Sequence, residues 1–252
     1  MTAVYDGFAP FYDLEYGHKE DDLEFYLDVA QQIGSPILEI GAGSGRISLP
    51  LVQEGHTVYG IDNSAEMLSL AEQKRSQLSP DLQKRAHFSV QDMTEFELPL
   101  KFPLCIMPFR VFLHNLSTGD QIATLDCIYE HLEPDGILAF DLFVPLYNML
   151  ARSEWSETYT PDELAGDHDD LTVTSHVVHD PAKQLLTINN RYRQNRENFE
   201  RQMQYRYIFR YEMEHLLSMC GFAVEQVYGG FEGQPYDYSS GLMIFTASKQ
   251  ED

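Results

Sequence analysis

Short apolar segments alternate with amphipathic runs along residues 36–143. The apolar segments are Ile37–Ile40, Thr57–Asp62, His87–Val90, Phe102–Phe109 and Ile137–Phe143. Between them, apolar residues recur at three- and four-residue steps, as in Ala65–Gln77 and Thr118–Leu132, which is the spacing of one helix face. Strands that alternate with helices predict an α/β fold with a doubly wound parallel sheet.

The first apolar segment ends in a glycine-rich turn. Three glycines stand at alternate positions, Gly41, Gly43 and Gly45, before an amphipathic run begins near Arg46. Glycine suits such a turn because it adopts positive φ and has no Cβ to keep a ligand off the backbone. A strand, a glycine turn and a helix in this order form the nucleotide-binding half of a doubly wound sheet. We therefore expect a cofactor site at this turn.

The glycine spacing and two acidic residues near the glycines indicate which of two possible cofactors the site binds. A dinucleotide site has the spacing Gly-x-Gly-x-x-Gly and holds a pyrophosphate on a helix N-terminus, whereas this chain has Gly-x-Gly-x-Gly. Glu39 would repel a pyrophosphate and suits an ammonium group, such as that of the methionine part of S-adenosylmethionine. Asp62 ends the second apolar segment, 21 residues after Gly41, where a carboxylate can accept both ribose hydroxyls.

On the Glu-x-Gly-x-Gly-x-Gly motif and Asp62, the chain resembles the class I S-adenosylmethionine-dependent methyltransferases of the small-molecule type. The resemblance extends over nearly the whole chain and is strongest over residues 36–143. It implies a seven-stranded, mostly parallel Rossmann-like sheet that ends in an antiparallel hairpin. It also implies S-adenosylmethionine as cofactor and direct in-line methyl transfer to a nitrogen, oxygen or sulfur atom of a small molecule.

The resemblance implies further cofactor contacts. Asp92 and Met93 follow the third apolar segment, where family members hold adenine through a carboxylate and the next backbone N–H. Met67 either lines the adenosine or packs within its helix. The predicted cofactor-binding residues are Glu39, Gly41, Ala42, Gly43, Gly45, Asp62, Asn63, Met67, Asp92, Met93, Pro108, Phe109, Arg110 and Tyr5.

Three side chains are candidates for contact with the methyl acceptor: His114, Tyr12 and Asp141. With an ordinary pKa of about 6.5, His114 could take a proton from an acceptor amine or hydroxyl, or it could cap a helix or bond a backbone carbonyl. Asp141 stands at the carboxyl end of the fifth strand, where ligands of such sheets bind. Arg110 could pair with an acceptor carboxylate or, as part of the scaffold, with Glu39 or Asp141.

Residues 1–35 are predicted to form a helical cap over the cofactor. Aromatic residues recur at three- and four-residue steps from Tyr5 onward, which predicts a helix with an aromatic face. The resemblance implies that Tyr5 and Tyr12 reach the cofactor and the acceptor. Packing against the core explains the aromatic residues equally well, and we expect it for Phe8 and Phe11.

Residues 144–210 depart from the alternation of strands and helices. Leu171–His179 and Leu185–Arg193 alternate polar and apolar residues, and we expect a third strand at Gln202–Arg210. This pattern predicts an antiparallel β insert before residues 211–252, which complete the core sheet. In related methyltransferases such an insert covers the acceptor pocket or forms a dimer contact, so a homodimer through the insert is a further prediction.

The insert is basic although the whole chain is acidic. Between Lys183 and Arg210 there are seven basic and two acidic residues, in a chain of formal net charge −23. Arg191 and Arg193 share one face of a strand, as Arg206 and Arg210 would, and arginine forks bind carboxylate or phosphate. An anionic acceptor is one hypothesis. The other is a solvated or dimer-facing surface whose arginines pair with acids elsewhere.

Composition narrows the partners and the location. With 17 basic and 40 acidic residues, the chain would repel nucleic acid and anionic membrane surfaces. No apolar run approaches the ~20 residues of a membrane span, and the first residues lack the features of a signal peptide, so we expect a cytoplasmic protein. The three cysteines lie far apart without metal-binding spacing, which predicts buried thiols and no metal site.

Two other functions stay open on the sequence alone. The chain could bind S-adenosylmethionine without catalysis, as a regulatory protein. A nicotinamide-dependent oxidoreductase would use the same fold, although Glu39 and the glycine spacing argue against it. Measurements of cofactor binding and of turnover distinguish these functions.

Overall fold

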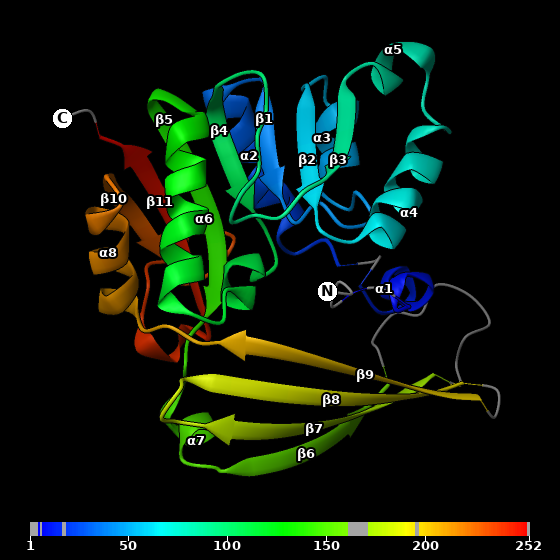
Figure 1. Ribbon diagram of the computed structural model, residues 1–252, viewed down its shortest axis with the longest axis vertical. Coiled ribbons are helices and arrows are strands. Elements are labelled where there is room, and N and C mark those ends of the chain that lie inside the picture. Colours follow the sequence, from blue (N-terminus) through cyan, green and yellow to red (C-terminus); the bar gives the residue numbers. More distant parts are fainter. Residues whose placement is uncertain (1–4, 6, 17–18, 161–170, 195–196, 251–252) are drawn as a thin grey trace.

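The computed structural model describes residues 5, 7–16, 19–160, 171–194 and 197–250. Its larger sheet has seven strands in the order β10-β11-β5-β4-β1-β2-β3 (Figure 1). These strands are β1 (Ile37–Ile40), β2 (Val58–Asp62), β3 (Ala86–Val90), β4 (Phe102–Met107), β5 (Leu132–Phe143), β10 (Phe222–Tyr228) and β11 (Leu242–Lys249). The first five pair in parallel, and β11 pairs antiparallel with β5 and β10. The expected doubly wound sheet with its antiparallel closing hairpin is confirmed.

Helices cover both faces of this sheet. The helical elements are α1 (Ala9–Tyr16), α2 (Leu23–Ile33), α3 (Ser48–Gln53), α4 (Ala65–Arg75), α5 (Pro80–Gln83), α6 (Thr118–His131), α7 (Tyr147–Leu150), α8 (Arg210–Met219) and the 3-10 turns η1 (Val111–His114) and η2 (Tyr238–Ser240). Leu38 and Ile40 pack into the core shared with α6 and α8, whereas Ile37 packs into the core shared with α2 and α3. Successive strand residues face opposite sides, so an apolar run buries both faces.

The insert forms a second, four-stranded antiparallel sheet in the order β6-β7-β8-β9. Its strands are β6 (Glu154–Tyr159), β7 (Thr172–Asp180), β8 (Leu185–Gln194) and β9 (Glu197–Arg206). The third predicted strand is wrong in its bounds, because Arg210 begins α8. The first strand went unpredicted because β6 is an edge strand with largely exposed side chains, so it lacks a clear apolar alternation.

The two sheets meet at the carboxyl ends of the core strands. In Figure 1 the four-stranded sheet lies below these ends, and α1 lies between the core and the far end of β9. Glu15 of α1 accepts hydrogen bonds from Tyr159 of β6 and Tyr192 of β8, each at 2.8 Å. The expected division into cap, core and insert stays a prediction.

Two further expectations concern the membrane and the cysteines. Among the described residues, no helix is long and apolar enough to cross a bilayer. Cys105 and Cys220 are buried and Cys127 is half-buried, and all three are free thiols.

Candidate active site

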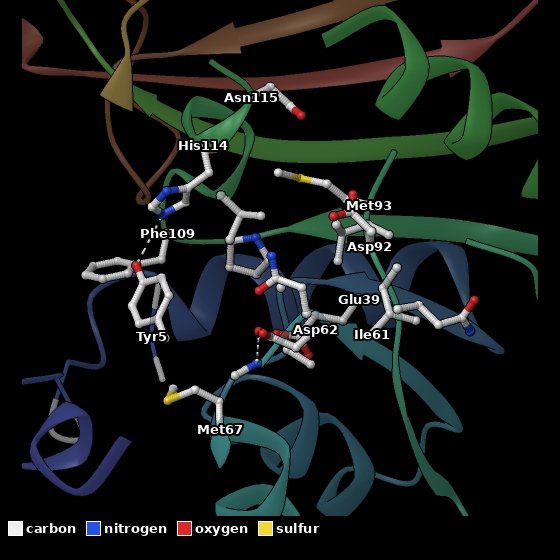
Figure 2. Close-up of a pocket in the computed structure, with 18 of the residues that line it drawn as sticks. Tyr5, Glu39, Ile61, Asp62, Met67, Asp92, Met93, Phe109, His114 and Asn115 are labelled. Carbon is white, nitrogen blue, oxygen red and sulfur yellow. Dashed lines mark hydrogen bonds between the residues drawn. The ribbon is translucent and has the colours of Figure 1, made fainter. Parts of the chain in front are cut away.

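A cavity of about 330 Å³ opens where the core strands end and the cap begins (Figure 2). Most of the predicted site residues line it, namely Tyr5, Tyr12, Glu39, Gly41, Ala42, Gly43, Asp62, Asn63, Met67, Asp92, Met93, Pro108, Phe109 and His114. In Figure 2, Tyr5, Phe109 and His114 lie together at one side, and Asp92 and Met93 lie opposite. The wall does not include Gly45, Arg110 or Asp141.

The glycine turn brings backbone close to the cavity. Gly41 and Gly43 have φ values of 73° and 55°, which residues other than glycine rarely adopt. A Cβ on Gly41 would lie 2.5 Å from the side chain of Val111, so this position also needs glycine for space. Gly45 does not line the cavity, and a Cβ there would lie 3.1 Å from the Leu49 side chain and 3.3 Å from that of Ala71, so its contact with the cofactor stays a prediction.

The carboxylate of Asp62 is held in place by backbone groups at the end of β2. The Gly43 N–H donates to Oδ2 at 2.9 Å, and the Ser64 N–H donates to Oδ1 at 2.8 Å. Ser64 also caps α4 by accepting from the Met67 N–H at 3.2 Å. Met67 is buried, packs with the cap and lines the cavity, and its contact with the adenosine stays a prediction.

Glu39 is a buried acid on the floor of the cavity. It is 2 % exposed and accepts a hydrogen bond from the Ser48 hydroxyl. Burial raises the pKa of Glu39 to about 8, although Ser48 and the nearby Arg46 oppose the shift. A cation placed beside this group would favour its charged form, so the site suits an ammonium ligand.

Arg46 is a cavity residue that the sequence reasoning did not select. Its guanidinium forms a two-pronged ion pair with buried Asp22, with N–O distances of 2.6 and 2.7 Å, and donates to the Lys19 carbonyl at 2.9 Å. The pair joins the segment before α2 to the glycine turn. The position of Arg46 directly after the glycines could have indicated a role in the site. Its partner Asp22 lies 24 residues away in the chain, so the ion pair was not evident from the sequence.

The end of the cavity away from the cap is lined by residues that follow β3 and η1 in the chain. Asp92 accepts from the Thr94 N–H and hydroxyl at 2.9 and 2.7 Å. Asn115 accepts from Thr124 at 2.9 Å, and its Nδ2 has no partner in the part of the chain that the structure describes. Lining residues that the sequence reasoning missed include Arg46, Gln91, Thr94, Val111, Asn115, Leu116 and Asp120.

The turn after β4 is held from below by Asp141. Phe109 and Arg110 have positive φ values of 60° and 64°, and Asp141 accepts from the Phe109 N–H at 2.7 Å and from the Tyr26 hydroxyl at 2.8 Å. Asp141 is 2 % exposed, and burial raises its pKa. The structure thus makes Asp141 a support for the turn and not the acceptor contact that we expected.

Arg110 likewise differs from its expected place on the cofactor. Its guanidinium lies 5.8 Å from the Phe109 ring and 6.0 Å from the Phe143 ring. The charge of Arg110 lowers the pKa of Asp141, although the burial of Asp141 outweighs it. The buried Nε of Arg110 makes no hydrogen bond with a described residue, so its pairing with Glu39 or Asp141 stays a prediction.

His114 and Tyr5 form a polar pair at the cap side of the cavity. The Tyr5 hydroxyl and His114 Nε2 are 3.2 Å apart. Burial and the nearby charge of Arg201 lower the pKa of His114 to about 4, so the imidazole is neutral at neutral pH. Tyr12 is buried beside them, and its pKa is raised by burial, so it stays protonated and can donate a hydrogen bond.

Comparison with known proteins agrees with the fold and the site. Residues 37–136 match the family of the methyltransferase domain. YqeM of Bacillus subtilis, which bears a methyltransferase name, is 28 % identical over 98 % of each chain. Among solved structures, the CcbJ methyltransferase of Streptomyces caelestis has a TM-score of 0.88 at 21 % identity over 99 % of each chain. The SAM-bound CalS10 of Micromonospora echinaspora, an amino pentose methyltransferase, has a TM-score of 0.66 at 17 % identity over 99 % of this chain and 98 % of its own.

The fold and the comparisons together identify a Rossmann-like methyltransferase domain. The protein is an S-adenosylmethionine-dependent methyltransferase, and S-adenosylmethionine is its cofactor. The residues present fit this group, since Glu39 is a buried carboxyl on the cavity wall where an ammonium group would favour its charged form, and a Cβ on Gly41 would collide with Val111. The nicotinamide alternative is therefore set aside.

Proposed function

We propose that this enzyme transfers the methyl group directly to a nitrogen, oxygen or sulfur atom of a small-molecule acceptor that binds between the cofactor and the insert sheet. The observation that carries the proposal is the Tyr5–His114 pair. It stands on the wall of the cofactor cavity, yet its atoms come from the cap and from η1, which contacts β9. A small molecule in this place would touch the cofactor and the insert together.

The core side of the cavity would orient the cofactor. Glu39 would accept from the ammonium group, Asp62 from the ribose hydroxyls, and Asp92 with Met93 would hold the adenine. When bound, S-adenosylmethionine supplies a methyl group that its positive sulfur already activates. The chain's own task is then to align the acceptor's lone pair and to exclude water.

The cap side would handle the acceptor. His114 is neutral, so its Nε2 can accept from the Tyr5 hydroxyl and hold that group toward the cavity. The Tyr5 hydroxyl, held by His114, would orient the reacting atom of the acceptor through a hydrogen bond, whereas His114 itself, with a pKa of about 4, takes up no proton at neutral pH. Tyr12 would donate a hydrogen bond from the same side. Asp141 would act at one remove, by positioning the Phe109 turn.

Small acceptors are favoured by charge as well as by size. The formal net charge of −23 opposes binding of nucleic acid. The structural similarity to CalS10, an amino pentose methyltransferase, supports an acceptor of that size. The homodimer through the insert stays a prediction, and light scattering of the purified protein would test it.

The test is turnover on a panel of small amines, hydroxyl compounds and thiols, followed by formation of S-adenosylhomocysteine. We expect at least one acceptor to react, and Tyr5→Phe and His114→Gln to lower kcat about 10²-fold or more. His215→Gln, which changes an exposed histidine on α8, is the matched control and should react normally. Tight cofactor binding without turnover on any acceptor would instead favour the regulatory alternative.

A further inference from the structure

The inner face of the insert sheet carries a buried polar row. Ser175 of β7, Asn190 of β8 and Arg201 of β9 stand opposite one another in register. Their exposed fractions are 5 %, 3 % and 7 %. The neighbouring row is apolar and aromatic, with Tyr192 paired to Phe199. A polar row in such a setting needs partners, because buried polar groups without hydrogen bonds are unfavourable.

Arg201 has no such partner in the part of the chain that the structure describes. Its Nε, Nη1 and Nη2 are buried and make no hydrogen bond, and Oδ1 of the adjacent Asn190 makes none either. The Arg201 Cζ lies 4.2 Å from the ring centres of both Tyr5 and Phe8. These two centres are only 6.5 Å apart, so the rings do not enclose the guanidinium from opposite faces.

The other arginines of the insert show what a satisfied group looks like here. Arg191 pairs with Glu200 at 2.8 Å, and Arg210 pairs with Glu214 at 2.7 Å. Arg206 donates to Thr118 at 2.9 Å. The arginine pairs that suggested an anionic acceptor are thus occupied or exposed, whereas Arg201 is the buried cation that forms no ion pair with a described residue.

Tyr5 connects this cation to the cofactor cavity. One face of the Tyr5 ring covers the guanidinium, and the same residue lines the cavity and contacts His114. The charge of Arg201 is close enough to depress the pKa of His114. An acceptor whose nucleophile lies beside the cofactor could therefore extend past Tyr5 to the polar row.

We propose that Arg201 and Asn190 form an oxyanion subsite, which takes a carboxylate or phosphate group of the methyl acceptor. The inference rests on the proposed small-molecule methyl transfer. The planar guanidinium fork binds either oxyanion through two parallel hydrogen bonds, and Asn190 Oδ1 accepts from a neighbouring hydroxyl or amine of the ligand. Because the three nitrogens are buried, the aromatic cover of Tyr5 and Phe8 opens as the anion enters and packs against it afterwards.

The first experiment measures thermal unfolding of the protein saturated with S-adenosylhomocysteine. The probes are millimolar acetate and inorganic phosphate, each at constant ionic strength set with chloride. We expect at least one anion to raise the Tm of the wild type by roughly 3 °C and to leave the Tm of Arg201→Met unchanged. Arg191→Met removes an exposed arginine from the same sheet and keeps the full rise. Arg201→Lys keeps the positive charge but lacks the planar guanidinium, and it should show part of the rise in Tm.

The Tm measured without anion shows whether Arg201 is a ligand-binding residue or only a structural one. Replacement of an unpaired buried cation by an apolar side chain of similar shape should leave the anion-free Tm equal or higher. A fall of several degrees in Arg201→Met would make the guanidinium part of the aromatic packing and would overturn the proposal. Equal anion effects in the wild type and Arg201→Met, or none in either, would overturn it as well.

Turnover keeps the two proposals distinguishable. For any acceptor that reacts, Arg201→Met should raise KM at least tenfold with a smaller change in kcat, and Arg191→Met should not. Acceptors that carry a carboxylate and acceptors that carry a phosphate are assayed separately, and the class whose KM depends on Arg201 identifies the oxyanion that the subsite binds. Reaction of neutral acceptors only, unaffected by Arg201→Met, would overturn the subsite but keep methyl transfer. Anion-dependent stabilisation without any turnover would contradict methyl transfer and leave the subsite in place.

Discussion

The core wall of the cavity and the inner face of the insert sheet hold their charged groups differently. On the core wall, Arg46 pairs with Asp22, and two backbone N–H groups hold Asp62. On the inner face of the insert sheet, Arg201 and Asn190 keep buried polar atoms that no described residue satisfies. The charged groups of the core wall are thus held by protein partners, although Arg46 Nε and Asn115 Nδ2 also make no hydrogen bond with a described residue. The Arg201 guanidinium differs because all three of its nitrogens lack such a partner.

This difference matches the two substrates of the enzyme. The cofactor is the same in every reaction, so a site whose donors and acceptors are already oriented binds it with little rearrangement. The acceptor must enter and leave past an aromatic cover. In the proposed subsite, Arg201 gains hydrogen bonds only when an anionic acceptor binds, and it would therefore select for a charged ligand.

The largest expected effect concerns the buried pair of the core wall. Arg46→Met should lower the free energy of unfolding by about 3–5 kcal/mol, because Asp22 is left buried without its cation. Urea unfolding measures this loss. The double variant Asp22→Leu with Arg46→Met should recover most of the stability, since neither charge then remains. A loss below about 1 kcal/mol for Arg46→Met would erase the contrast with Arg201→Met.

A second effect concerns cofactor binding. Asp62→Ala should weaken binding of S-adenosylhomocysteine about 100-fold, because hydrogen bonds to a charged acceptor are worth about 1.5–3 kcal/mol. Calorimetric titration of the two proteins measures the ratio. Asp81→Ala removes the same charge from an exposed site on α5 and should bind normally. Unchanged affinity in Asp62→Ala would remove this carboxylate from the cofactor site.

The pH dependence of the free enzyme tests the buried acid of the core wall. The pKa of Glu39 is raised to about 8, so the folded state binds a proton that the unfolded state releases near pH 4.5. Its contribution to stability is complete below that pH and is lost as the pH rises toward 8. We expect a slope of up to about 1.4 kcal/mol per pH unit in this range, and Glu39→Gln should remove its share of the slope.

Cofactor binding should show the opposite dependence. The ammonium group favours ionised Glu39, so affinity for S-adenosylmethionine should rise with pH up to about 8. Titration calorimetry in two buffers of different ionisation enthalpy counts the proton released on binding. Absence of proton release in the wild type, or the same release in Glu39→Gln, would place the ammonium group elsewhere.

The smallest effect concerns the contact of the cap with the insert. Glu15→Gln keeps one acceptor oxygen and loses the charge that accepts from Tyr159 and Tyr192. We expect a loss of about 1 kcal/mol in the free energy of unfolding. Glu72→Gln, which breaks an exposed helix pair with Arg75, should lose less than about 0.5 kcal/mol. Equal losses would mean that Glu15 is an ordinary surface acid.

The sequence by itself determined the core sheet and most of the cofactor site. The apolar alternation placed the strands, and the spacing of Glu39, Gly41, Gly43 and Asp62 indicated the cofactor. Such features are readable because the chain connects these residues through one or two short elements, so local geometry brings them to the same sheet edge. Resemblance to a methyltransferase family supplied the seventh strand and the closing hairpin.

Tertiary structure decided which polar residues meet across the cavity. Tyr5 and His114 are 109 positions apart, and Tyr26 and Asp141 are 115 apart. The same packing placed Asp141 beneath a turn and left the buried guanidinium of Arg201 without a polar partner among the described residues. Strand alternation shows which insert residues share a face, but burial and partners depend on what packs against that face. These depend on long-range contacts, which local spacing does not encode.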